Sequence, residues 1–132
     1  MTRTLYSTFG PVTPKWVCGP VQTTTGETNP VIMSSLSTEY VQSAVSAVAA
    51  GVTVNPTTDA VAFAFVPVGS TPTSGDWHTG SWDTALATGT YLAQVLIGTG
   101  GVTLAAGTYA AWVKVTDSPE IPVAQIGTIQ IV

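Results

Sequence analysis

Apolar and polar residues alternate along much of the chain with the two-residue period of half-buried β-strands. Near position 63, the bulky side chains of Val61, Phe63 and Phe65 alternate with alanines. Three further segments with a strand pattern are residues 91–97, 109–116 and 126–132. Glycines and prolines that form turns separate these segments. Short strands at such spacing predict an all-β fold, either a sandwich or a barrel.

Residues 38–50 fit two patterns. Tyr40, Ala44 and Val48 have helical spacing, and Gly51 would then cap the C-terminus of a helix. The same residues also alternate with the period of a strand, and their valines favour β-structure. We predict a strand here.

The residues that precede the penultimate predicted strand carry the most specific local signal. In immunoglobulin-like sandwiches, a tyrosine at this place bonds through its hydroxyl to the backbone a few residues upstream. Tyr109 has this position, Gly107 would allow a tight turn, and Leu104 would fill the core. We read Trp112 as a core aromatic residue. The pattern therefore predicts an Ig-like, or fibronectin-like, antiparallel β-sandwich over residues 35–132.

Residues 1–34 differ from the rest because prolines and a polar run interrupt them. Proline favours extended backbone, and the large apolar side chains of this segment would have no use in a mobile tail. We therefore predict an extended N-terminal arm, residues 1–34, that docks on partner subunits, with a mobile tail as the alternative. The residues expected to make these contacts are Leu5, Tyr6, Phe9 and Trp16.

Charged residues make up only 8% of the 132-residue, 13.5 kDa chain, against about 25% in an average protein. Three Lys and Arg side chains exclude a basic nucleic-acid surface, and a lone cysteine excludes a disulfide scaffold. We expect no signal peptide and no membrane span, because no sufficiently long apolar run occurs. Such a surface packs against neighbours with little desolvation of charge. We read this as a subunit of a large assembly, with a low-charge monomer as the alternative.

Candidate catalytic groups are few. His78 lies close in sequence to Asp76 and Asp83, which would suit a metal site or an acid–base pair. The two carboxylates also suit turn caps, and the chain has no second histidine. The glycine-rich residues 98–101 are read as a hairpin loop, because no dinucleotide-binding pattern follows. We predict no catalytic, cofactor or metal site, and hence no enzyme.

Two tryptophans occupy a polar stretch between strands. If exposed, Trp77 and Trp82 would be stacking platforms for sugars or anchors at a protein interface, with His78 as a polar neighbour. The alternative is that one or both turn inward and join the core.

The chain resembles small virion proteins of tailed bacteriophages that infect high-GC Gram-positive hosts. The residues that carry the resemblance are 59–65 (DAVAFAF), Asp76-Trp77, Ser81-Trp82 and 107–123 (GTYAAWVKVTDSPEIPV). The resemblance covers residues 35–132 and leaves out the arm. It implies an Ig-like structural module of the virion, such as a capsid decoration protein or a head–tail component, and no active site.

These observations favour a capsid decoration or minor capsid protein that binds and stabilises the shell. Its expected partners are the major capsid protein or other virion subunits, and it would be a homo-oligomer within the assembly. It would be made in the host cytoplasm and end on the capsid exterior, with no nucleic-acid or membrane partner. Two alternatives remain, namely a head–tail connector or tail component, and a carbohydrate-binding or host-adhesion module that binds cell-surface glycans through Trp77 and Trp82.

Overall fold

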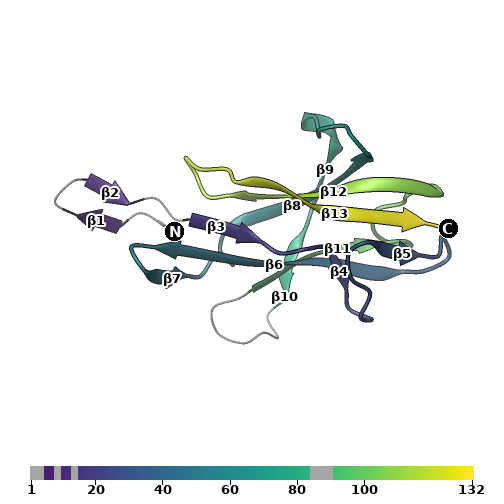
Figure 1. Ribbon diagram of the computed structural model, residues 1–132, viewed down its shortest axis with the longest axis horizontal. Helices are drawn as coiled ribbons and strands as arrows, with labels where there is room; N and C mark the ends of the chain where they lie inside the picture. Colours follow the sequence, from purple (N-terminus) through teal and green to yellow (C-terminus); the bar gives the residue numbers. More distant parts are fainter. Residues whose placement is uncertain (1–4, 8–9, 13–14, 84–90) are drawn as a thin grey trace.

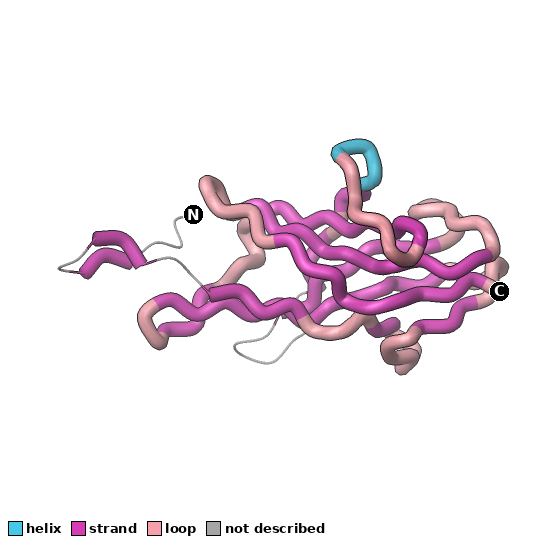
Figure 2. The backbone as a smooth tube through the Cα atoms, turned by 45° about the horizontal axis from the view of Figure 1, so that its top comes forward, coloured by secondary structure: helices cyan, strands magenta, loops and turns pink. Residues whose placement is uncertain are grey.

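The computed structural model describes residues 5–7, 10–12, 15–83 and 91–132, and it shows two β-sheets packed face to face (Figures 1 and 2). Sheet I has the order β10 (Ser81–Asp83), β11 (Tyr91–Ile97), β6 (Glu39–Ala49) and β3 (Lys15–Cys18), and β4 (Gln22–Thr23) and β7 (Val52–Val54) also pair with β6. Sheet II has the order β5 (Val31–Met33), β13 (Val123–Ile131), β12 (Gly107–Thr116), β8 (Ala60–Pro67) and β9 (Trp77–Thr79). The predicted all-β sandwich is confirmed.

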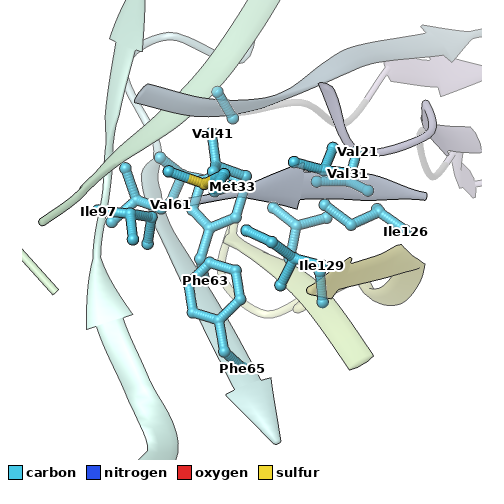
Figure 3. Close-up of a cluster of buried hydrophobic side chains, with 14 of the residues drawn as sticks. Val21, Val31, Met33, Val41, Val61, Phe63, Phe65, Ile97, Ile126 and Ile129 are labelled. Atoms are coloured by element: carbon cyan, nitrogen blue, oxygen red, sulfur yellow. The ribbon is translucent and has the colours of Figure 1, made fainter. Parts of the chain in front are cut away.

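The core lies between the two sheets and is filled by one face of each strand. In β8, Val61, Phe63 and Phe65 belong to the core as predicted, but Ala64 and Val66 are also buried, so exposure alternates only in the first half of the strand. Figure 3 shows Phe63 among aliphatic side chains from both sheets, with Val41 of β6 and Ile129 of β13 nearby. The alternating residues of the sequence therefore build a single core.

The segment with two readings forms strand β6, as predicted. β6 pairs antiparallel with β11 on one side and with β3 and β4 on the other. These neighbours satisfy the backbone hydrogen bonds of β6, which in a helix would be made within the segment. Val41 and Val45 are buried, whereas Tyr40 and Val48 are exposed on the outer face. Gly51 is not a helix cap. It forms a two-residue hairpin turn with Ala50, and both residues have positive φ.

The predicted tyrosine hydrogen bond is present at the start of β12. The hydroxyl of Tyr109 donates to the carbonyl oxygen of Ala105 at 2.7 Å, and Gly107 has a φ of 151°. Leu104 packs against the core, as expected. The prediction for Trp112 is wrong, because its strand neighbours face the core and the indole therefore lies on the outer face of sheet II.

Residues 15–33 belong to the sandwich, which differs from the predicted arm over residues 1–34. β3 and β4 pair with β6, and β5 pairs in parallel with the edge of β13. Val21, Val31 and Met33 are buried in the core (Figure 3). The prolines of this region lie in the connections, where a missing N–H removes no ladder hydrogen bond.

The N-terminal residues that the structure describes before this segment form a separate hairpin. Strand β1 (Leu5–Ser7) pairs with β2 (Gly10–Val12), and no other pairing involves these described residues. Figure 1 shows the hairpin beyond one end of the sandwich. Only this part of the predicted arm therefore lies outside the two sheets.

Two connections between strands complete the fold. Residues 98–106 lead from β11 in sheet I to β12 in sheet II, so the glycine-rich loop crosses between the sheets and is not the predicted hairpin. The connection from β12 to β13 is the expected hairpin. The helical residues described are the 3-10 turn η1 (Ser74–Asp76), and no described helix is long and apolar enough to cross a membrane.

Candidate binding groove

A groove of about 770 Å³ runs along the side of the sandwich where each sheet ends, at β9 in sheet II and at β10 and β11 in sheet I. Its polar side chains are His78, Thr79, Ser81, Gln94 and Thr103. Its aromatic and aliphatic residues are Tyr40, Trp77, Val95, Leu96 and Val102. We call this feature the edge groove.

The groove exists because β10 is short. Strand β10 pairs with β11 only from Leu92 to Gln94, so the remaining residues of β11 continue past its end. The loop after β11 folds back there. The Val102 amide donates to the Leu96 carbonyl oxygen at 2.8 Å, and the Gly98 amide donates to the Val102 carbonyl oxygen at 2.8 Å. The edge groove lies between this loop and β9.

Two glycines hold the walls close to β11. A Cβ atom at Gly80 would lie 2.7 Å from the Gln94 carbonyl oxygen and 3.1 Å from the Phe63 ring. A Cβ atom at Gly101 would overlap the carbonyl group of Leu96. Real Cβ atoms do not approach backbone atoms so closely. The two places where the chain passes next to β11, at Gly80 and at Gly101, therefore require glycine. Sequence analysis missed this role, although a glycine next to a strand is the signal that could have shown it.

Gln94 is held in place from the neighbouring strand. The Gln42 Nε2 group donates to Gln94 Oε1 at 3.1 Å and lies 3.4 Å from Asp83 Oδ2. Gln42 is 2% exposed although it lies on the outer face of sheet I, because these polar neighbours cover it. With its oxygen engaged, Gln94 offers its Nε2 amide as a donor to a ligand.

The structure separates the two predicted platform residues. Trp77 lines the edge groove, and Lys114 Nζ lies 4.5 Å from the centre of its ring. Trp82 packs against the core and donates from Nε1 to the Asp59 carbonyl oxygen at 2.9 Å. The expectation of an exposed Trp82 is therefore wrong, and its inward alternative holds. His78 lies opposite Phe63 and joins Trp77 in the groove.

The carboxylates near His78 have structural partners. Asp76 Oδ2 accepts hydrogen bonds from the Thr73 amide at 2.8 Å and from its hydroxyl at 2.9 Å, which confirms the turn-cap reading for Asp76, whereas Asp83 accepts from the Gln42 side chain. These bonds hold the pKa of Asp76 below its ordinary value, with a small contribution from His78. Within the described residues, no three His, Cys, Asp or Glu side chains gather in a way that could hold a metal. The arrangement suits binding through hydrogen bonds and ring contacts.

The predicted docking residues are only partly described. Trp16 lies in β3 and packs against the core, so it is not part of a free arm, and its contact with a partner stays a prediction. The backbone of Leu5 and Tyr6 lies in β1, but their side chains and the whole of Phe9 lie outside the described residues. Cys18 also packs against the core, and burial raises the pKa of its thiol.

Exposed aliphatic side chains gather at the end of the sandwich near the N-terminal hairpin. From sheet I these are Val17 at 55%, Val48 at 41% and Val52 at 58% exposure. Ile121 and Val123, near the β12–β13 turn, are exposed at the same end (Figure 1). Val17 and Val48 face outward from sheet I, and Val123 faces outward from sheet II, whereas Val52 faces the same side of sheet I as the buried Ala49. The five residues therefore share this end of the sandwich but not one face, and we call them together the hairpin-end patch. At the opposite end, Ile32, Leu36 and Val132 are exposed.

No protein-family model matches the chain, and a search of curated proteins found no significant match.

Proposed function

We propose that this chain is a non-enzymatic structural protein of a tailed-phage virion, a decoration protein that binds the outside of the capsid shell. The observation that carries the proposal is the hairpin-end patch. Five exposed β-branched side chains lie at the end of the sandwich from which the β1–β2 hairpin extends. Exposed apolar side chains around a projecting hairpin are suited to contact with neighbouring subunits.

The sparse charge supports the same function. Ten charged side chains serve an accessible surface of 6987 Å², and several of them are already engaged within the fold. Asp117 is 6% exposed, Asp76 accepts two bonds from Thr73, and Lys114 lies over Trp77. Few charges would therefore lose hydration when a partner covers the surface. A free soluble domain ordinarily carries many more.

Strand order supports the Ig-like part of the proposal. In Ig-like sandwiches, strands A, B, E and D form one sheet and strands C, F and G form the other. Taking β3 with β4 as A, β6 as B and β11 as E, with β10 as D, reproduces the first sheet, and β8, β12 and β13 follow as C, F and G. The Tyr109 hydrogen bond at the start of β12 fits this assignment. The resemblance to small virion proteins suggests the setting, a phage shell.

Incorporation into particles tests the proposal. In particles of the phage that encodes the chain, we expect the double variant Val48→Asp, Val52→Asp to lose at least about tenfold in copies per particle, because charge would enter a buried contact. Leu36→Asp is the matched control at the opposite end, where Leu36 is 93% exposed, and it should be incorporated normally. Equal incorporation of the double variant and the wild type would refute the proposed contact.

The copy number of the wild-type chain separates a shell protein from a head–tail component. A decoration protein should be present in on the order of hundreds of copies per particle, arranged with the shell, since each shell subunit offers a site. A connector or tail component should be present in about a dozen copies or fewer. Quantitative mass spectrometry of purified particles gives this number.

A further inference from the structure

We propose that the edge groove binds a neutral saccharide. The groove is formed by the fold itself, and none of its described lining residues belongs to the hairpin-end patch. Its volume of about 770 Å³ lies within the range of about 300–1,000 Å³ that is usual for ligand sites. The inference is therefore independent of the proposed shell contact.

Aromatic residues line the groove from both sheets. Tyr40 lies on the outer face of sheet I and Trp77 on the outer face of sheet II, so that each sheet contributes one aromatic residue, at opposite margins of the groove. Such rings combine an apolar face with a polar edge, and the C–H faces of a sugar ring stack on them while its hydroxyls stay hydrated. Lys114 Nζ lies 4.5 Å from the centre of the Trp77 ring, and the indole is only half-buried.

The groove offers polar groups of a kind that suits hydroxyls. Its described lining includes hydroxyls of serine and threonine, the Gln94 amide and His78, but no Lys, Arg, Asp or Glu side chain. Anionic ligands such as phosphates need charge-assisted partners, which are missing from this lining. Hydroxyl groups of a neutral sugar both donate and accept, and they match amides and hydroxyls.

Several groups that line the groove are already held in place by the fold. Gly80 and Gly101 fix the two chain crossings against β11, and the Gln42 Nε2 group fixes the oxygen of Gln94. A site whose groups are already oriented loses less conformational entropy when the ligand binds. An extended peptide that pairs with the edge of β11 is less well suited, because the carbonyl oxygen of Leu96 already accepts from Val102.

Titration with defined sugars tests the inference. The probes are neutral tetrasaccharides of glucose, of galactose and of N-acetylglucosamine, added to the full-length chain. At least one should bind with a Kd on the order of 1 mM, which is typical of a small open site. Amide chemical shifts should change at residues of β9, of β11 and of the loop that contains Gly101. Shifts confined to residues that do not line the groove, or no shift with any probe at 10 times this concentration, would overturn the proposal.

Variants locate the site. Trp77→Ala should weaken sugar binding at least about tenfold. The control is Trp112→Ala, which removes another half-buried tryptophan of sheet II. Trp112 does not line the groove, so this variant should bind sugar normally. Thr103→Trp fills the groove from an exposed position, and should abolish binding without removing a core contact. Unchanged binding by Thr103→Trp would place the sugar elsewhere and refute the inference. Retained shell incorporation by the same variant would leave the proposed function intact.

Discussion

Residues 5–12 and residues 15–33 come from the same proline-containing, apolar part of the sequence, but they have different places in the structure. In the first region, the described strands β1 and β2 pair only with each other. In the second region, the chain pairs with both sheets and contributes Val21, Val31 and Met33 to the core.

The difference shows what makes an apolar segment part of a fold. In residues 31–33 the apolar side chains alternate, so that Val31 and Met33 face the core while Ile32 is 51% exposed. The segment also covers the edge of β13, which would otherwise present unpaired backbone groups. Apolar composition alone therefore does not distinguish a docking arm from an edge strand.

The largest expected effect comes from a charge in the second region. Val31→Asp should lower the free energy of unfolding by about 3 kcal/mol or more, because it buries an unpaired carboxylate. Ile32→Asp is the matched control in the same strand, and it should change the free energy by about 0.5 kcal/mol or less. Urea unfolding measures both. Similar values for the two variants would show that β5 is not packed as described.

Thiol reactivity compares the two regions directly. Burial raises the pKa of Cys18, so the folded protein holds less thiolate at pH 8 than an exposed cysteine would. We expect Cys18 to react with a thiol reagent at least about tenfold more slowly than a cysteine introduced by Ser7→Cys in a Cys18→Ser background. The fold favours the neutral Cys18 thiol, because its pKa is higher in the folded protein than in the unfolded chain. The buried thiol therefore contributes its full stability at a pH below the unfolded-chain pKa of Cys18. That contribution is lost as the pH rises through the folded-state pKa of Cys18. Equal labelling rates would contradict the comparison.

The hydrogen bond of the Tyr109 hydroxyl should make a smaller contribution to the free energy of unfolding. Tyr109→Phe removes the bond to the Ala105 carbonyl oxygen and should lower the free energy of unfolding by about 1 kcal/mol. Tyr40→Phe, at a side chain that is 39% exposed, is the control and should have almost no effect. If Tyr109→Phe were neutral, the corner at the start of β12 would contribute nothing to stability.

The smallest expected effect is that of deleting residues 1–12. The described strands of this region pair only with each other, and hence the deletion should change the free energy of unfolding by less than about 0.5 kcal/mol. Urea unfolding of the truncated chain, compared with Tyr109→Phe, gives the answer. A loss larger than that of Tyr109→Phe would mean that the first region belongs to the fold.

Much of the sandwich could be predicted from the sequence, because period-two alternation and turn residues are local signals. The same alternation places Trp112 opposite Tyr109 and Ala111, on the outer face, and this pattern outweighs the general tendency of tryptophan to be buried. The alternation along β12 was therefore enough to predict the orientation of Trp112, and the prediction of a core residue ignored it.

The site was less predictable, because it depends on where the chain crosses between sheets. The crossing at Gly80 separates Trp77 in sheet II from Trp82 in sheet I, so that the first lies on the outer face and the second packs inward. Neither orientation follows from the residues themselves. Likewise, Tyr40 and Gln94 enter the edge groove only through the pairing of β6 with β11, which is a contact between distant parts of the sequence.

The most direct test of the account is the number of copies that particles carry when the first region is absent. The account predicts that a chain lacking residues 1–12 folds with unchanged stability but is incorporated at least about tenfold less than the full chain, because the proposed shell contact includes the hairpin. Incorporation of the truncated chain at the full level would contradict it.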